Sequence, residues 1–94
     1  MNVSSIIWTE DRVAHIARHN VTPEEFEEVC FGRSLVLRAQ TFGPNPVYNV
    51  LGQIDSGDYL LCVVIAMPDG IGYPVTARLM THNERRRYLG WRKQ

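Results

Sequence analysis

The sequence predicts an α+β domain with two layers, in which two N-terminal helices and one C-terminal helix pack on an antiparallel sheet. Three observations predict this fold. Apolar residues recur with a helical period up to Phe31 and with a strand-like period from Ser34 onward. Threonines suited to cap helices precede two charged segments, at Thr22 and Thr81. The chain has 94 residues, the usual size of one domain, so residues 1–94 are expected to form a single unit.

The N-terminal third predicts one strand and two helices. Residues 4–9 are rich in β-prone side chains and predict a short first strand. From Glu10 the apolar residues follow a helical spacing, which predicts a helix ending near His19–Asn20. Thr22, with a glutamate three residues later, has the pattern of a capping box. It predicts the start of a second helix, which Gly32 is expected to end.

The rest of the chain predicts a meander of four strands and a final helix. The strands are expected at 34–40, 47–54, 59–67 and 73–79, separated by turns rich in glycine, proline and aspartate. The third is apolar at both odd and even positions, which is typical of a central strand covered on both faces. Pro74 indicates that the last strand lies at an edge or carries a bulge.

The charges are balanced in number but separated along the chain. Ten acidic and ten basic side chains give a net charge of zero. Most of the acidic ones precede Cys30, whereas the segment from Arg78 onward is basic apart from Glu84. This separation allows one basic surface to face a polyanion although the whole chain is neutral.

Cysteine usage and hydropathy indicate a cytoplasmic protein. Cys30 and Cys62 lie in apolar patterns without metal-ligand spacing, so two buried free thiols in a reducing compartment are expected. No apolar run is long enough to span a membrane, and we expect neither a membrane partner nor a signal peptide. Motifs for nucleotide loops and zinc hydrolases are absent, so no cofactor is expected.

The first group of candidate functional residues is the helical face that carries Arg12, His15 and His19. Two histidines four residues apart can chelate a metal, but the sequence offers no third ligand. They can also act as acid and base, because an unperturbed imidazole titrates near pH 6.5. A third interpretation is a pair of surface histidines without a function.

The second group lies where the last strand meets the final helix. Arg78 ends the strand, and Arg85, Arg86 and Arg87 occupy the first turns of a helix capped by Thr81 and expected to fray near Gly90. Such a cluster indicates an anionic partner. Cleaving RNA without a metal needs cations for the charge on the phosphorane, which arginine supplies, and a base and an acid, which histidine or tyrosine can supply. The alternative is that the helical arginines only solvate the helix and pair with a nearby carboxylate.

Several short motifs, in order along most of the chain, resemble the BrnT-type toxins of bacterial type II toxin–antitoxin systems. They are Trp8, the run His15-Ile16-Ala17-Arg18-His19-Asn20-Val21-Thr22-Pro23-Glu24-Glu25, the pair Leu51-Gly52, the run Gly57-Asp58-Tyr59-Leu60, and Thr76-Ala77-Arg78 with Glu84-Arg85-Arg86-Arg87-Tyr88. The resemblance implies a RelE-like α+β fold and a metal-independent endoribonuclease. It also implies a tight complex with a small antitoxin, for example a ribbon-helix-helix protein.

The resemblance and the arginine and histidine patterns together give a set of candidate site residues. His19, Arg78, Glu84, Arg86 and Tyr88 match motif positions of the family, and Arg12 stands near the place of a family lysine. The candidate catalytic residues are His15, His19, Arg78 and Tyr88, and the candidate RNA-binding residues are Arg12, Arg38, Arg85 and Arg86.

The chain departs from the family at Pro46 and Val47, where an acidic residue and an arginine are usual, and at Tyr73, Pro74 and Leu79. Cations or polar residues are common at these places in the family. Two functions therefore follow from the sequence. One is an RNA-cleaving toxin neutralised by an antitoxin, and the other is a non-catalytic protein of the same fold that only binds such a partner.

Overall fold

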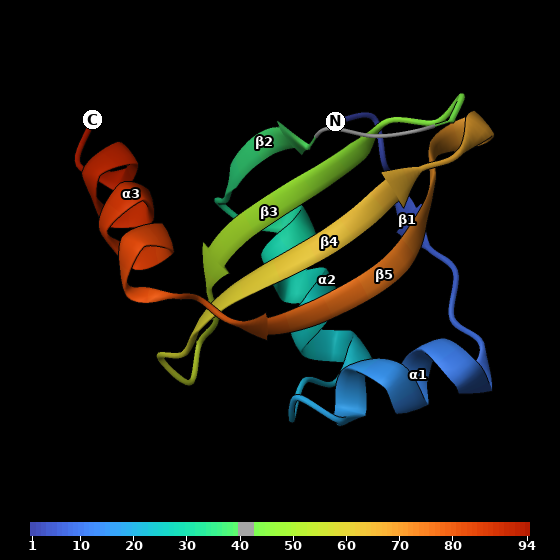
Figure 1. The fold of residues 1–94 in the computed structure, drawn as a ribbon, viewed down its shortest axis with the longest axis horizontal. Coiled ribbons are helices and arrows are strands. Elements are labelled where there is room, and N and C mark those ends of the chain that lie inside the picture. Colours follow the sequence, from blue (N-terminus) through green and yellow to red (C-terminus); the bar gives the residue numbers. More distant parts are fainter. Residues whose placement is uncertain (40–42) are drawn as a thin grey trace.

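The computed structural model describes residues 1–39 and 43–94 and shows three helices and a five-stranded sheet (Figure 1). A short 3-10 turn, Pro68–Gly70, joins the last two strands. The elements follow the order β1 (Ser5–Ile6), α1 (Glu10–Ala17), α2 (Pro23–Phe31), β2 (Leu35–Ala39), β3 (Val47–Gln53), β4 (Tyr59–Ala66), β5 (Ile71–Leu79) and α3 (His82–Arg92). Gln40, the last residue of the predicted strand 34–40, lies outside the described residues.

The sheet has the strand order β1-β5-β4-β3-β2. The predicted antiparallel meander of β2 to β5 is confirmed. The prediction of a wholly antiparallel sheet is wrong at β1, which runs parallel to β5 and pairs only Ser5 with Ile71 and Ile6 with Gly72. The helices carry the chain from β1 to β2 at the opposite edge, and the meander then returns β5 beside β1 in the same direction. The sheet is therefore mixed.

The helices cover both faces of the sheet, so the predicted two-layer arrangement is wrong at the end occupied by α3. Successive strand residues point to opposite faces. Val50 and Cys62 point toward α1 and α2, where they pack with Ile16 and Phe26 in the larger core cluster. The neighbouring residues of the same strands, Leu51 and Leu61, pack with Tyr88 of α3 in a second, smaller cluster.

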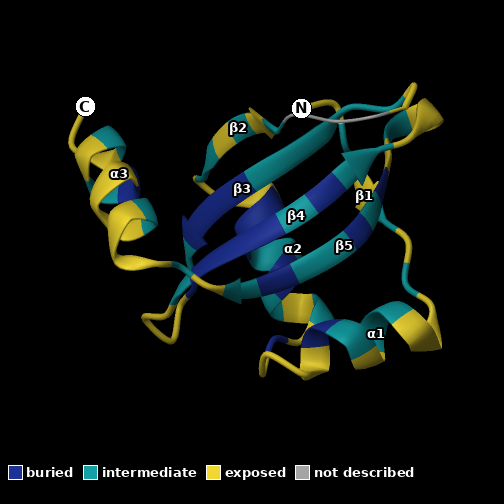
Figure 2. Ribbon diagram, in the orientation of Figure 1, coloured by how far each residue is buried: buried dark blue, intermediate teal, exposed yellow. Residues whose placement is uncertain are grey.

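β4 is the central strand, as predicted, but it is only partly covered on the α3 face. Its residues Leu60, Cys62 and Val64 are buried against the α1 and α2 layer. On the opposite face Val63 and Ile65 are half-buried, because α3 reaches only one end of the sheet (Figure 2). In the described residues, none of the helices is both long and apolar enough for a membrane span.

The helix ends follow the predicted capping chemistry, with two differences. Thr22 and Thr81 each form a complete capping box with the glutamate three residues later. Gly32 ends α2 in an extended conformation rather than a left-handed one, and a Cβ there would lie 2.6 Å from the carbonyl oxygen of Glu28. α3 does not fray at Gly90 but continues to Arg92.

The extension of α3 past its glycine has a tertiary cause. The ring of Trp91 packs at 5.9 Å from the ring of Tyr88, which joins the last turn to the buried cluster. Arg33 adds a hydrogen bond from its Nη2 to the carbonyl oxygen of Arg92 at 3.2 Å. Packing of this kind offsets the roughly 1 kcal/mol by which glycine disfavours a helix interior relative to alanine.

Pro74 lies in β5 beyond the two residues that pair with β1, and its strand carries a bulge, as predicted. Val63 pairs with Thr76 whereas the next residue, Val64, pairs with Pro74, so Val75 is the extra residue. The carbonyl oxygen of Val75 accepts a hydrogen bond from Arg12 Nη1 at 3.1 Å. The bulge therefore connects β5 to α1.

Candidate functional site

The junction between β5 and α3 is held by a forked ion pair. Arg78 Nη1 and Nη2 donate to the two carboxylate oxygens of Glu84 at 2.8 and 3.0 Å, and Nη1 also donates to the carbonyl oxygen of Leu79 at 3.0 Å. Hydrogen bonding to Arg78 lowers the pKa of the Glu84 carboxyl, and the same contact raises the pKa of Arg78. Glu84 also accepts from the backbone N–H of Thr81. One carboxylate thus joins the strand end, the helix cap and the arginine.

This pairing changes what Arg78 can do. The sequence predicts that its guanidinium is free for a phosphate, but both Nη groups face the Glu84 carboxylate. Carboxylate and phosphate compete for the same planar fork of an arginine. Arg78 therefore anchors α3 to β5 and presents little free positive charge in this arrangement.

Tyr88 lies in the core rather than on the surface. It is 1% exposed and packs between the rings of Tyr59, at 6.1 Å, and Trp91, at 5.9 Å. Its hydroxyl accepts a hydrogen bond from Arg92 Nη1 at 3.3 Å. A buried ring with an occupied hydroxyl fits a packing residue of α3 better than an acid that meets a substrate.

The three residues of the predicted α1 face have different surroundings. Arg12 pairs with Asp11 at 2.6 Å and lies 5.6 Å above the ring of Tyr73 on β5. His15 is half-buried on α1. His19 is exposed in the turn after the helix, where it lines a hollow that includes neither of the other two. Of this group, only His19 faces a surface depression.

Two small hollows meet at the turn between β3 and β4. The first, about 160 Å³, is lined by His19, Asn20, Glu25, Ile54, Asp58, Leu60 and Leu79. The second, about 260 Å³, is lined by Gly57, Asp58, Tyr59, Leu79, Met80 and Arg85. They share Asp58 and Leu79, so one continuous band runs from His19 to Arg85. Leu79, 59% exposed, stands between the two. We call this band the corner surface.

Arg85 is the cation that the structure brings to the corner surface. Its Cζ lies 4.1 Å from the centre of the Tyr59 ring, the shortest cation–π contact among the described residues. Within the described ranges, the ion pairs involve Arg12 and Arg78 but not Arg85. Arg86 is exposed on α3, and Arg38 lies over the ring of Tyr48 at 5.8 Å. Neither lines the corner surface.

Sequence reasoning did not single out Asp58, Tyr59 and Leu79 as site residues. Asp58 and Tyr59 belong to one of the motif runs and Leu79 is a departure from the family pattern, but neither observation assigned them a role; the predicted turn between the strands 47–54 and 59–67 marked only where two strands end. The turn is held by hydrogen bonds from the N–H of Ile54 to the carbonyl oxygen of Asp58 and from the N–H of Gly57 to that of Ile54. Arg92 contacts the side chain of Gln53, which in turn contacts Gly57. α3 thus helps to fix the turn.

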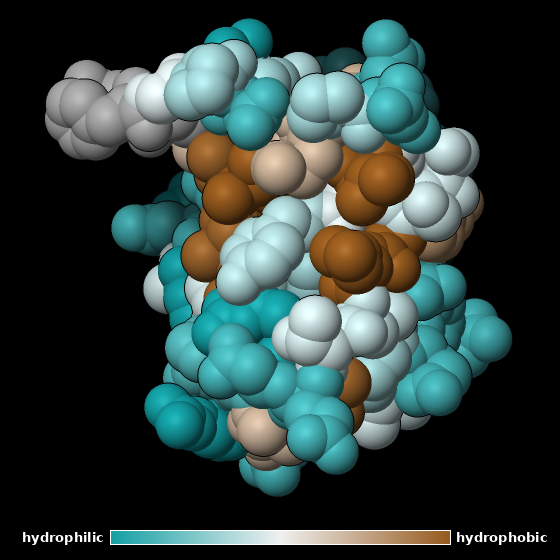
Figure 3. All heavy atoms as spheres, turned by 90° about the vertical axis from the view of Figure 1, so that its right-hand side faces the viewer, coloured by the Kyte–Doolittle hydropathy of each residue, from teal (hydrophilic) through white to brown (hydrophobic). Residues whose placement is uncertain are grey.

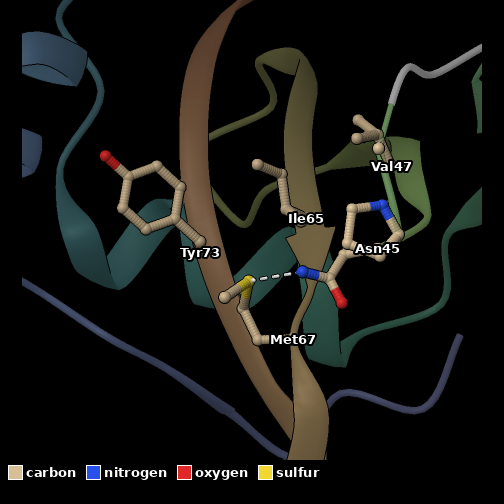
Figure 4. A pocket seen from close by; sticks show the side chains of 7 residues that line it. Asn45, Val47, Ile65, Met67 and Tyr73 are labelled. Carbon is tan, nitrogen blue, oxygen red and sulfur yellow. Dashed lines mark hydrogen bonds between the residues drawn. The ribbon is translucent and has the colours of Figure 1, made fainter.

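A separate apolar hollow of about 340 Å³ lies at the far end of the same sheet face. Figure 4 shows Ile65 and Tyr73 side by side on neighbouring strands, facing Val47, Met67 and Asn45. Asn45 Nδ2 contacts the sulfur of Met67 at 3.6 Å. Figure 3 views this end of the molecule and shows hydrophobic side chains gathered in its upper half. Val47 and Tyr73, two of the departures from the BrnT pattern, both line this hollow.

No group of three or more potential metal ligands occurs within residues 1–39 and 43–94. His15 and His19 therefore have no further histidine, cysteine or carboxylate ligand among these residues.

No protein-family model matches the sequence, and a search of curated proteins also gives no match. The resemblance to BrnT toxins therefore remains a hypothesis that rests on the motif residues.

Proposed function

We propose that the protein is a BrnT-like toxin, a metal-independent endoribonuclease that a small antitoxin neutralises. One observation carries the proposal: His19 and Arg85 lie on the two sides of the same turn, in hollows that share Asp58 and Leu79. A histidine and an arginine on one surface can supply two of the three groups that metal-free cleavage of RNA requires, the base and the cation. The motif resemblance supplies the class of reaction.

In this proposal His19 removes the proton from a ribose 2′-hydroxyl. The 2′-oxygen then attacks the adjacent phosphorus, a 2′,3′-cyclic phosphate forms and the bond to the 5′-oxygen breaks. The leaving 5′-oxygen takes up a proton from an acid, for which His15 on α1, the helix that precedes His19, is the candidate. Arg85 and Arg86 seat the phosphates and offset the charge that builds up on the phosphorane.

Arg78 enters the proposal as a positioning residue. Its fork to Glu84 fixes the start of α3, and α3 carries Arg85. Replacing Arg78 by methionine should therefore lower activity by loosening this junction, and Arg78→Lys should restore only part of it, because lysine cannot form the two-pronged contact.

The test is induced expression in bacteria, followed by incubation of the purified protein with RNA in the presence of a metal chelator. The wild-type protein should stop growth and cleave RNA. His19→Gln should reduce cleavage at least 100-fold, at the low end of what a general base contributes. His82→Gln, which alters an exposed histidine at the start of α3, is the matched control and should cleave like the wild type. Equal activity of the His19 and His82 variants would exclude this site.

A second function, a partner-binding protein without nuclease activity, is favoured by a different observation. The apolar hollow with Val47 and Tyr73 occupies places where the family usually carries cations, and Arg78 and Tyr88 are both engaged in structural contacts. An apolar hollow on a half-covered sheet suits a protein partner better than a phosphate backbone.

The salt dependence of RNA binding separates the two functions. A nuclease that binds phosphates should lose affinity for RNA steeply between about 50 and 200 mM salt. Binding releases counterions from the RNA, and this release becomes less favourable as the salt concentration rises. A protein that only binds a partner should show weak RNA binding without that slope, while it still forms a complex with the product of a neighbouring small reading frame. Coexpression of the two chains and size-exclusion chromatography would detect this complex.

A further inference from the structure

We propose that the hollow between Tyr59, Arg85 and Asp58 binds one unpaired nucleobase of an RNA strand, and that it selects guanine. The inference rests on the proposed action on RNA and adds a base-recognition subsite to it. The subsite lies on the corner surface beside the His19 hollow, so a base bound there belongs to a nucleotide next to the one whose 2′-hydroxyl His19 would deprotonate.

The first support is the stacked pair of Arg85 and Tyr59. The Cζ of Arg85 lies 4.1 Å from the centre of the Tyr59 ring, and Arg85 is exposed on α3, so the aromatic ring and the guanidinium are together accessible at this hollow. Single-stranded RNA is commonly recognised by stacking bases on aromatic rings or on arginine planes. Tyr59 is itself fixed, because its ring packs on Tyr88 and its carbonyl oxygen accepts from the N–H of Met80 at 2.9 Å. The stacking platform is therefore rigid.

The second support is Asp58, an acidic residue that lines the same hollow. The carboxylate of an aspartate repels phosphate, so the Asp58 side of the hollow suits a base better than the backbone of the strand. A carboxylate accepts hydrogen bonds only, and its two oxygens can take two parallel N–H donors. Guanine presents such a pair at N1 and N2, whereas adenine and uracil do not. Asp58 therefore gives the hollow a preference for guanine.

The third support is size and polarity. The hollow of about 260 Å³ is smaller than the roughly 300 Å³ at which pockets for whole cofactors begin. Its lining combines a cation, a carboxylate and an aromatic ring with Leu79 and Met80. Gly57, with φ of +106° and open space around its missing side chain, leaves the rim clear. These features suit a single heterocycle with polar edges.

The direct test uses guanosine, adenosine and uridine 3′-monophosphates as probes, titrated into the ¹⁵N-labelled protein and followed by NMR. Guanosine monophosphate should shift the amide signals of Gly57, Asp58 and Tyr59 at lower concentration than the other two. Asp58→Asn should abolish the preference for guanine, because the amide has only one acceptor oxygen. This readout does not depend on cleavage, so it remains informative if the protein proves inactive as a nuclease.

A second measurement places the base in an RNA strand. Fluorescence anisotropy compares binding of a uridine decamer that contains one guanine with binding of the same decamer containing one adenine. Arg85→Ala should weaken binding at least about fivefold, the low end of what stacking one base contributes. Arg87→Ala, which removes an equal charge from an exposed position on the same helix, should weaken binding less and leave the guanine preference intact.

The outcomes separate this inference from the proposed function. If the wild-type protein cleaves RNA but all three nucleotides shift the same signals equally, the guanine subsite is wrong and the nuclease stands. If guanosine monophosphate alone shifts the amide signals of the turn residues and no RNA is cleaved, the guanine subsite is supported and the proposed nuclease activity is wrong. Equal effects of the Arg85 and Arg87 variants would show that Arg85 contributes charge only and would overturn the stacking part of the proposal.

Discussion

On the α1 and α2 face of the sheet, the central side chains Val50, Cys62 and Val64 are completely covered, whereas Val63 and Ile65 on the α3 face of β4 are only half-buried. The covered face is continuous from α1 to the end of β3 and contains both cysteines. The α3 face has a small cluster at one end, an apolar hollow at the other, and the corner surface at its border. The apolar hollow lies on the less covered face and α3, which carries Arg85, packs on it, whereas the His19 hollow is lined partly by Ile54 and Leu60 of the larger cluster.

The difference separates stability from binding within one small domain. Burial of apolar area is the main source of folding stability, and a chain of this size can bury only a modest apolar area. One helix layer supplies most of this burial, which allows the opposite face to keep exposed apolar and charged groups. Four predictions test this division, from the largest expected effect on stability to the smallest.

Phe26→Ala should cost about 3–5 kcal/mol in the free energy of unfolding, because Phe26 is fully buried under α2 and its ring meets Trp8 edge-on at 5.4 Å. Unfolding in urea, followed by circular dichroism, measures this loss. Phe31→Ala on the same helix is the control, since Phe31 is 47% exposed and should cost far less. Similar losses in the free energy of unfolding for the two variants would mean that the face under α1 and α2 does not supply most of the stability.

The Arg78–Glu84 pair should contribute about 1 kcal/mol, since it is forked but only partly buried. A double-mutant cycle with Arg78→Met and Glu84→Gln measures the coupling. The folded-state pKa of Glu84 is lowered, so the contribution is present above its ordinary pKa of about 4.3 and is lost as the pH falls through the lower folded-state value. The coupling should therefore be unchanged from pH 5 to 8. A coupling that fades near neutrality would contradict the pairing.

Tyr88→Phe should cost about 0.5–1 kcal/mol, because it removes only a hydroxyl whose contact with Arg92 is long at 3.3 Å. If Tyr88 is a packing residue, this variant should inhibit growth like the wild type. A loss of RNA cleavage with unchanged stability would restore Tyr88 as a catalytic residue. Thermal unfolding and the cleavage assay measure the two quantities on one preparation.

Met67→Glu should change stability by no more than about 0.5 kcal/mol, because Met67 is exposed at the rim of the apolar hollow. If that hollow receives the antitoxin, the same variant should weaken the complex at least tenfold by placing a charge in an apolar contact. Asp69→Lys, in the neighbouring turn and outside the hollow, is the control for a change of charge. Calorimetric titration with the antitoxin would show the difference.

Much of the architecture was predictable because local signals agree with it. The two capping boxes, the alternation before Ala39 and the bulge near Pro74 each depend on residues that are neighbours in sequence. The parallel pairing of β1 was not predictable, because two hydrogen-bonded residues leave no periodic pattern. The continuation of α3 past Gly90 depends on Trp91 meeting a ring that is itself buried by distant strands.

The candidate site was predictable only in part. The sequence pointed to His19 and Arg85 because histidines and clustered arginines are visible as residue types. It did not show that Arg78 faces Glu84, although the two are six residues apart, because that contact depends on the angle between a strand end and a helix. Asp58 and Tyr59 looked like ordinary turn and strand residues until the turn was seen beside α3.

By itself, the sequence determined the class of the fold, the limits of most elements and the separation of acidic from basic residues, because periodicity, caps and charge are properties of short segments. Only the tertiary structure decided which arginine is free and which is paired, which tyrosine is buried, and that α3 covers one end of a face. Those outcomes depend on how strands and helices meet, because groups from different elements compete there for the same space and the same hydrogen-bond partners. A carboxylate can satisfy Arg78 only where folding brings the two together.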